Sequence, residues 1–245
     1  PFNLSGFSGT YAVSYNPVAL LLRPRVHNPQ LYINGNAFIK VEILDGLSFK
    51  SNFGVNLDRD SYKRFDPKIP EIGRANGNNY LTHSEANENR WIWDQQLNYT
   101  KQFGAHNLDL VAVYSAQHTR YDYYYVQGMG FEREDEWYQY IGNASSIPKL
   151  PTSSVYEDAL TSAIGRANYN YDNRYFLSAS IRQDRTSRLS ANNRSDVFPS
   201  VSAAWKISSE PFFNISLVND LKIRASWGQI GNIQSVVAYA FNLPL

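Results

Sequence analysis

The sequence has 245 residues, which is enough for one large domain or two small ones. Its 23 basic and 22 acidic residues leave a net charge of +1, and this balance argues against the concentrated basic face of a nucleic-acid-binding protein. The sequence has no cysteine, so a disulfide framework and a thiolate metal site are both excluded.

Helical membrane signals are missing from the sequence. The apolar run 18–22 is far shorter than the ~18 residues of a membrane-spanning helix. The first ten residues lack the basic and apolar regions of a signal peptide, so for a secreted or outer-membrane protein we expect the start to be missing or already removed. A polar composition also fits a β-barrel membrane protein, because only alternate strand residues face lipid.

The first part of the chain predicts an irregular loop followed by a hairpin. Residues 1–30 are irregular, and alternating apolar residues then predict strands over 37–43 and 47–57. A two-residue type I′ turn at Asp45-Gly46 would place Lys40 and Glu42 on the apolar face. We therefore prefer a three-residue loop, 44–46, in which Gly46 is left-handed and the apolar faces match.

Two more strands are predicted in the middle of the chain. They cover 91–103 and 108–116 and are joined by a tight turn at 104–107. The polar stretches on either side of this pair, 58–88 and 118–160, are predicted as long loops.

The clearest alternation lies between residues 162 and 228. It predicts four strands, each with one apolar and one polar face, over 162–171, 175–184, 197–207 and 221–227. A three-residue loop at 172–174 would pair Tyr171 with Tyr175, and a third polar loop would cover 186–196. Runs of about 8–11 residues suit tilted strands that cross a bilayer.

The connections alternate between short and long along the predicted meander. Long loops therefore gather at one end and tight turns at the other, with 208–220 as the exception, which is the layout of outer-membrane barrels. Aromatic residues lie near the tight-turn ends (Tyr99, Phe103, Tyr169, Tyr171, Tyr175, Trp205) and near the long-loop ends (Trp91, Trp93, Tyr114). Two rings of aromatic residues at the membrane interfaces are typical of a β-barrel in a bilayer. The alternative explanation is that these aromatic residues lie in the core and at the edges of a soluble β-sandwich.

Several short stretches also carry a family resemblance. They are NPVAL at 16–20, GNA at 35–37, GLSFKSN at 46–52, LNYTKQFG at 97–104 with HNL at 106–108, GRANY at 165–169, SIRQD at 180–184, FPSVSAAW at 198–205 and LKIRASWGQIGN at 221–232. In order and spacing, these stretches resemble the SusC/RagA family of TonB-dependent outer-membrane transporters of Bacteroidetes-type bacteria.

The resemblance implies an all-β fold, namely an antiparallel up-and-down transmembrane β-barrel segment with about eight strands of a larger, plugged barrel of the 22-stranded type. We find no TonB box, plug domain or barrel-closing strand, so we expect residues 1–245 to be a middle part of one barrel domain. The resemblance further implies transport of glycans or peptides, not an enzyme. No cofactor or metal is expected.

Partners are implied by the same resemblance. They are a SusD-type lipoprotein lid, the TonB complex (through parts outside this chain), outer-membrane lipid, and the glycan or peptide solute. A dimer of the transporter–lid pair is left open, and no nucleic acid is expected. The sequence does not distinguish a glycan from a peptide.

Polar-face residues of the predicted strands are candidates for the barrel lumen. We expect Arg166, Arg182, Asp184, Lys222 and Arg224 to face the lumen or the plug, together with Lys50, Asn52, Asn168 and Lys206. The alternative role is a hydrated ladder of side chains that hold one another in place.

Aromatic residues of the second long loop are candidates for contact with solute or lid. They are Tyr121, Tyr123, Tyr124, Tyr125, Trp137 and Tyr138, with Tyr140 beside them. Aromatic faces stack on sugars and pack against proteins, but a long loop also packs on itself. The acidic run 132–136 matches no EF-hand spacing, so a solvated charge run is favoured over a Ca²⁺ site.

Two other classes of function are compatible with the sequence. A soluble carbohydrate-binding β-sandwich is the main alternative, and a small outer-membrane enzyme is the third. The four histidines are scattered without an HExxH-type pair, and no carboxylate pair is singled out, so the enzyme has the least support. An arginine at Ala179 or Ala203 distinguishes the barrel from the sandwich, because a lipid-facing charge is costly.

Overall fold

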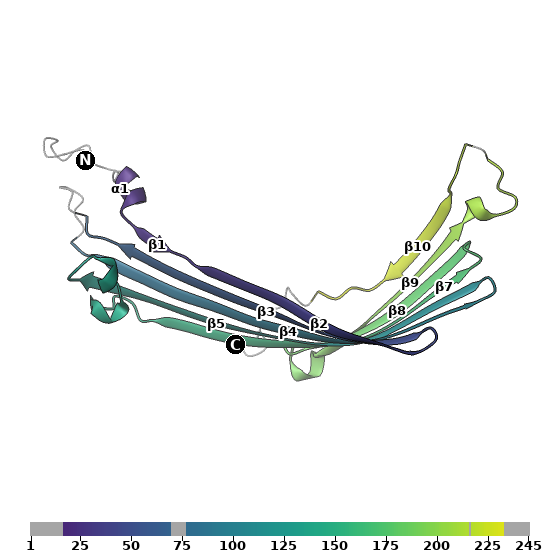
Figure 1. Ribbon diagram of the computed structural model, residues 1–245, viewed down its shortest axis with the longest axis horizontal. Coiled ribbons are helices and arrows are strands. Elements are labelled where there is room, and N and C mark those ends of the chain that lie inside the picture. The colour runs from purple at the N-terminus through teal and green to yellow at the C-terminus, as the bar shows by residue number, and fades with distance from the viewer. Residues whose placement is uncertain (1–16, 70–76, 216, 233–245) are drawn as a thin grey trace. The chain divides into compact units, whose positions relative to one another are not determined.

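The computed structural model describes residues 17–69, 77–215 and 217–232 (Figure 1). The long strands are β2 (Gln30–Leu44), β3 (Leu47–Asp66), β4 (Tyr80–Phe103), β5 (His106–Phe131), β7 (Thr152–Tyr171), β8 (Tyr175–Thr186), β9 (Ser195–Lys206) and β10 (Lys222–Gly228). The short elements are α1 (Pro17–Leu22), β1 (Arg25–His27), η1 (Glu136–Tyr138), η2 (Ile141–Asn143), β6 (Ala144–Ser146), η3 (Ala191–Asn193) and η4 (Ile207–Ser209).

The ten strands of the described residues form one sheet. Its order is β1-β3-β4-β5-β7-β8-β9-β10, with β2 also paired to β3 and β6 to β5. The eight long strands match the eight predicted ones, whereas the three-residue strands β1 and β6 were not predicted. None of the described helices has the length and apolar character needed to cross a membrane.

The chain divides into two compact units. Unit 1 consists of Pro1–Ile33, Leu57–Asn89 and Tyr121–Tyr156, and unit 2 consists of Asn34–Asn56, Arg90–Arg120 and Glu157–Leu245. Strands β2, β3, β4, β5 and β7 contribute residues to both units.

The two predicted long loops are mostly strand, which corrects the sequence interpretation. β3 continues to Asp66 and β4 begins at Tyr80, so the first connection is far shorter than 58–88. β5 continues to Phe131 and β7 begins at Thr152, which shortens the second. Backbone hydrogen bonds sustain a strand without an apolar face, so the alternation of apolar residues ends before the strand does.

The predicted start of the sheet was also too late. Within 1–30, the described part contains α1 and β1, and the first long strand begins at Gln30 rather than at residue 37. Residues 1–16 of the predicted loop lie outside the described residues. The loop predicted over 186–196 shrinks because β8 reaches Thr186 and β9 begins at Ser195, with η3 between them.

One hairpin connection agrees with the sequence interpretation, and another agrees only in the conformation of its glycine. In the latter, only Asp45 and Gly46 separate β2, which ends at Leu44, from β3, which begins at Leu47, whereas the sequence predicts a three-residue loop over 44–46. Gly46 has φ +77° and Asp45 has no positive φ, which excludes the type I′ turn because that turn needs both residues left-handed. In the other hairpin, Tyr171 pairs with Tyr175 as expected. Here Asp172 and Asn173 both have positive φ, and the Arg174 N–H donates to the Tyr171 carbonyl at 3.0 Å.

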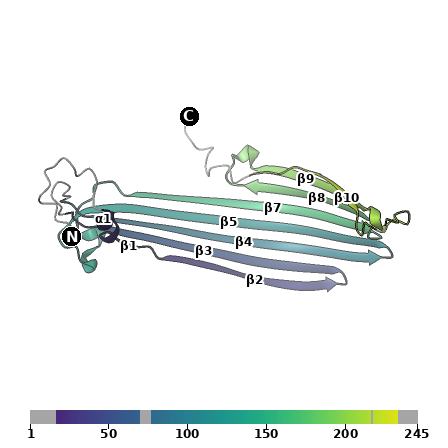
Figure 2. The same ribbon diagram turned by 90° about the horizontal axis from the view of Figure 1, so that it is seen from above.

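Unit 2 is a sheet with two chemically different faces. β7, β8, β9 and β10 follow one another across it (Figure 2), and β8 pairs antiparallel with β7 and β9. Its apolar face is open: Leu177 is 54% exposed and Ile223 is 57% exposed. A β-sandwich would cover this face with a second sheet, and no other described element of unit 2 does so.

The apolar face of unit 2 carries a row of aromatic rings at its tight-turn end. Successive ring centroids are 4.8–6.5 Å apart from Phe103 through His106, Tyr171, Tyr175 and Trp205 to Phe212. The row crosses the ends of β4, β5, β7, β8 and β9. This geometry agrees with the predicted girdle at the tight-turn ends.

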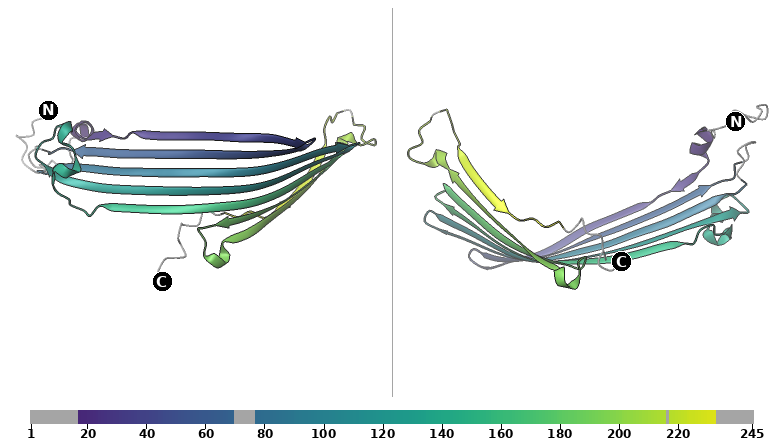
Figure 3. Two further views of the ribbon diagram at one scale, coloured as in Figure 1. Left: turned by 60° about the horizontal axis from the view of Figure 1, so that its bottom comes forward. Right: turned by 180° about the vertical axis from the view of Figure 1, so that it is seen from behind.

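Unit 1 has a small core at the ends of its strands. Phe65, Leu81 and Phe131 are each 1% exposed, and Tyr138 of η1 and Ile141 of η2 pack against them. Figure 3 shows the short helical turns of this connection beside the ends of the long strands. The rings of Phe65 and Phe131 meet edge to face at 5.5 Å. The connection between β5 and β7 is therefore a packed structure.

Candidate functional site

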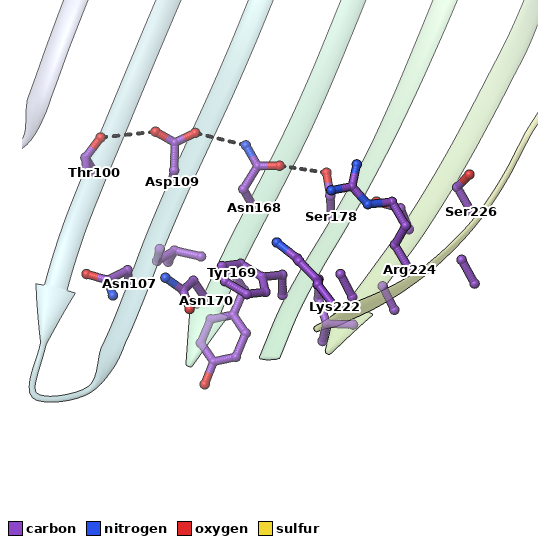
Figure 4. A pocket seen from close by; sticks show the side chains of 17 residues that line it. Thr100, Asn107, Asp109, Asn168, Tyr169, Asn170, Ser178, Lys222, Arg224 and Ser226 are labelled. Atoms are coloured by element: carbon purple, nitrogen blue, oxygen red, sulfur yellow. Dashed lines mark hydrogen bonds between the residues drawn. The ribbon is translucent and has the colours of Figure 1, made fainter. Parts of the chain in front are cut away.

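A polar ladder crosses four neighbouring strands on the wet face of unit 2, the face opposite the open apolar residues (Figure 4). Thr100 of β4 donates to Asp109 of β5 at 3.3 Å, and Asn168 of β7 donates to the other Asp109 carboxylate oxygen at 3.2 Å. Ser178 of β8 then donates to Asn168 at 2.6 Å. Both Asp109 oxygens are thus engaged within the ladder.

The ladder borders a hollow of ≈ 440 Å³ on the same face. Lys222 and Arg224 of β10 line the hollow beside the ladder (Figure 4). The Lys222 ammonium lies 3.7 Å from the ring centroid of Phe176, a cation–π contact. The strand register brings Phe176 of β8 close to the two cations of β10. Phe176 and Arg224 both pair with Ala204 of β9, one from each side.

Arg182 and Asp184 form a tight pair farther along β8. The Arg182 Nε donates to both Asp184 carboxylate oxygens, at 2.7 and 2.9 Å, and its Nη2 donates to Ser162 at 3.3 Å. Asp184 is buried. This arrangement fits the alternative role given above for these residues, in which polar side chains of the barrel wall hold one another in place.

Arg166 is exposed on the wet face of β7 and is apart from this pair. In register it lies opposite Ser180, which contacts Ser200 at 2.7 Å. The described residues give it no ion-pair partner. The structure therefore brings Lys222 and Arg224 together, pairs Arg182 with Asp184, and leaves Arg166 separate.

Four of the aromatic candidates lie on a strand of unit 1, which corrects their predicted loop placement. Tyr121, Tyr123, Tyr124 and Tyr125 all belong to β5. The alternation of a strand puts Tyr124, which is 40% exposed, on the face opposite the other three. The Tyr121 ring stacks on Tyr156 of β7 at 5.2 Å, so it is already occupied by a neighbour.

The other two candidates, Trp137 and Tyr138, lie within the turn η1. Trp137 is 88% exposed, whereas Tyr138 packs on the small core of unit 1. Loop self-packing thus accounts for Tyr138 and leaves Trp137 as the accessible ring.

Two residues of the acidic run 132–136 are engaged by hydrogen bonds or ion pairs with their neighbours. The Glu134 carboxylate accepts from the Lys68 N–H at 2.8 Å and from the buried Asn79 amide at 2.9 Å, and Arg133 pairs with Asp135 at 2.8 Å. Across residues 17–69, 77–215 and 217–232, no group of three His, Asp or Glu residues is arranged to hold a metal ion.

Sequence reasoning missed a buried carboxylate at the end of β9. Glu210 follows η4, its side chain is 8% exposed, and it accepts hydrogen bonds from the Tyr175 hydroxyl at 2.6 Å and the Trp205 indole N–H at 2.9 Å. Arg174 adds an ion pair at 3.3 Å. These donors, Tyr175 first, lower the pKa of Glu210. Nothing in the local sequence pattern singles out Glu210, because its donors come from two other strand ends.

Comparison with known proteins identifies the family. No family model matches the chain. It is 30% identical over 231 residues to TonB-dependent receptor P3 of Formosa agariphila, covering 91% of this chain and 23% of that protein. It is 34% identical over 180 residues to TonB-dependent receptor SusC of Bacteroides thetaiotaomicron, covering 69% and 17%. A solved structure of the RagAB peptide transporter matches 90% of this chain and 24% of its own, with a TM-score of 0.82 at 20% identity.

The chain belongs to the SusC/RagA family. It spans about a quarter of the length of the relatives it matches. The match to RagAB shows that the sheet is a segment of an antiparallel β-barrel, and SusC/RagA barrels lie in the bacterial outer membrane. The open apolar face of unit 2 is therefore explained by contact with lipid.

Proposed function

We propose that this chain forms part of the wall of a TonB-dependent transporter that imports a nutrient across the outer membrane. The observation that carries the proposal is the two-faced sheet of unit 2. Its apolar face is open, and its wet face is cross-linked by hydrogen bonds from Thr100 to Ser178. A protein that separates lipid from an aqueous lumen needs both faces. Residues 1–245 would then belong to one barrel domain.

In this proposal, the wet-face charges line the lumen and meet the plug or a passing solute. They are Arg166, Arg182, Asp184, Lys222 and Arg224. The exposed Trp137, with Tyr121, Tyr123, Tyr124, Tyr125 and Tyr138 near it in sequence, would contact solute or lid. Trp137 is the better candidate for this contact because its side chain is exposed, whereas Tyr138 packs on the small core of unit 1.

The proposed cargo is a glycan or an oligopeptide. A relative is named SusC, and a similar solved structure is described as the RagAB peptide transporter, which supports a cargo of this kind without distinguishing the two. A SusD-type lipoprotein lid, coupling to TonB and a dimer of the transporter–lid pair belong to the same proposal.

The experiment that tests the proposal is electrophoresis of the native protein extracted from outer membranes, with and without boiling. A folded barrel resists detergent and migrates differently once boiled, so we expect a species several times heavier than 28.0 kDa that shifts on boiling. A 28 kDa species in the soluble fraction, unchanged by boiling, would overturn the proposal and favour the carbohydrate-binding sandwich.

A further inference from the structure

We infer that the outward face of unit 2 carries a binding site for the phosphate group of an outer-leaflet lipid, with Arg185 and Arg194 as its cationic partners. The site is a second hollow, of ≈ 500 Å³, whose lining residues all belong to unit 2. It lies on the lipid side of the wall rather than on the lumen side, so the inference goes beyond the proposed transport function.

Strand alternation places this hollow on the lipid-facing side. Gln183 and Arg185 of β8 have the same parity as Ile181, which is 55% exposed on the apolar face. Thr161 of β7 and Ser195 of β9 both pair with Arg185, so the three lie side by side on that face. The plug of such a barrel fills the lumen and therefore lies against the opposite face.

All four strands that line the hollow are interior strands of the described sheet. They are β5, β7, β8 and β9, with β4 beside β5 and β10 beside β9 (Figure 2). Further strands of the barrel join the sheet at its edges, so they do not border the hollow. Its side walls therefore come from this chain.

The length of β8 puts the hollow at the height of the lipid head groups. Arg185 follows Tyr175, a member of the aromatic row at the tight-turn end, by ten residues. Ten residues of strand extend about 33 Å, and a tilt of about 35–45° reduces this to about 25 Å, the height of a barrel's apolar band. Tight turns lie at the periplasmic end, so Arg185 lies at the outer leaflet.

The outward face changes from apolar to polar at this height. On the tight-turn side, Ile181 and Val197 are 55% and 41% exposed, and Tyr114 of β5 is 53% exposed at the edge of the hollow. The row formed by Thr161, Arg185 and Ser195 follows. A lipid can cover the apolar residues with its acyl chains and reach the arginines with its phosphate, whereas a free phosphate ion gains nothing from the apolar residues.

Two arginines give the hollow its charge. Among the described residues that line it, the other polar side chains are neutral. The nearby acids Asp184 and Asp196 pair in register on the opposite face, where Asp184 accepts from Arg182. Guanidinium groups bind phosphate through their forked N–H groups, and neutral donors such as Gln183 can bind its remaining oxygens.

Both cations project from backbone that the sheet holds in place. β8 pairs with β7 and β9 on either side of Arg185. The Arg194 Nε donates to the Leu189 carbonyl at 3.1 Å, and the Arg194 carbonyl accepts from the Thr186 N–H at 2.9 Å. This arrangement lowers the cost of ordering the site when a ligand binds.

The test is binding of two lipids to the full-length receptor, purified in detergent and followed by native mass spectrometry. One is monophosphoryl lipid A, an acylated and phosphorylated disaccharide of the bacterial outer leaflet, and the other is the same lipid without its phosphate. We expect the phosphorylated lipid to bind about tenfold more tightly, as two exposed ion pairs predict. Arg185→Gln/Arg194→Gln should remove this preference and leave the affinity of the dephosphorylated lipid unchanged.

A matched control removes two cations of the same face outside the hollow. Lys101 follows Thr100 of the polar ladder and therefore points outward, and Arg120 shares the parity of Tyr114 on β5. Lys101→Gln/Arg120→Gln should keep the preference for the phosphorylated lipid. Equal affinity of the wild type for both lipids, or an equal loss in the control, would overturn the inference.

Two further measurements separate a lipid site from a general anion site and binding from folding. Inorganic phosphate that displaces the lipid at equal concentration would overturn the inference and make the hollow a site for free anions. The shift on boiling shows for each variant that the barrel has formed. If the double variant does not fold, Arg185→Gln alone decides, because Arg185 is exposed and the contacts of Arg194 stay intact. It should reduce the preference to about threefold, and an unchanged preference would contradict the inference.

Discussion

At the scale of single residues, Glu210 links the rim of the barrel segment to its aromatic row. Its carboxylate collects donors from Tyr175 and Trp205, whose rings stack at 6.5 Å with an interplanar angle of 8°. The two aromatic residues lie directly opposite each other on β8 and β9. The connection between β9 and β10 is therefore held against the girdle by one buried side chain.

We predict that Glu210→Gln loosens this connection. The amide keeps the size of the side chain but loses the charge that strengthens hydrogen bonds from Tyr175 and Trp205. Limited proteolysis of the folded receptor should cut between residues 211 and 220 faster than in the wild type. Asp220→Asn is the control, because Asp220 is 64% exposed and its pair with Lys206, at 3.4 Å, is a surface contact. Equal cutting of both variants would contradict the prediction.

The pKa of Glu210 also predicts a pH dependence. Its pKa is lowered in the folded chain by the hydrogen bonds from Tyr175 and then Trp205, relative to an ordinary value of 4.5. The unfolded chain therefore binds this proton more readily, and the stabilisation is fully present above about pH 4.5 and is lost as the pH falls through the lower, folded pKa. Fluorescence of Trp205 should report the change, and Glu210→Gln should remove it. A transition of the same size in that variant would rule Glu210 out.

At the scale of elements, each strand of unit 2 separates two environments through its alternation. On β9, Ala203 belongs to the exposed apolar face, and its neighbour Ser202 lies on the wet face between Ser178 and Ser226. A shift of register by one residue would exchange these faces.

Arginine substitutions on β9 test this separation. Ala203→Arg should destabilise the barrel by about 2–4 kcal/mol if the position faces the bilayer midplane, because the charge must leave water. Ser202→Arg, one residue away, should be tolerated far better on the wet face. The unfolding free energy in lipid vesicles is the measurement, and Ala179→Arg repeats the test on β8. Equal assembly of both β9 variants would show that Ala203 does not face lipid.

At the scale of the whole molecule, the described sheet has edges at β2 and β10. In lipid, an unpaired strand edge leaves backbone groups without hydrogen-bond partners, which costs several kcal/mol for each group. The segment therefore depends on further strands for its stability in a membrane.

We predict that the 245-residue chain by itself does not form a stable barrel. After refolding into vesicles it should remain sensitive to protease and show no shift on boiling, whereas the full-length receptor should show both protection and a shift. A protected, heat-modifiable monomer of the isolated chain would contradict this prediction and show that its strands close on one another.

The sequence by itself determined the family, the strand pairs and the two faces. Alternation from 162 to 228 placed four strands and their lipid-facing residues, because side-chain direction in a strand follows directly from position. The turn residues identified the pairing of Tyr171 with Tyr175. The sequence pattern did not predict that β5 continues to Phe131. Backbone hydrogen bonds hold this part of the strand, and they leave no alternation of apolar and polar side chains in the sequence.

Only the tertiary structure decided which side chains meet. It placed Tyr121 against Tyr156, Asn79 beside Glu134, and three donors around Glu210. It also showed that Asp109 is engaged by the ladder while Lys222 and Arg224 share a hollow without an acidic partner among the described residues. These contacts join residues far apart in the chain, and they depend on strand register and rotamer, which a one-dimensional pattern does not contain.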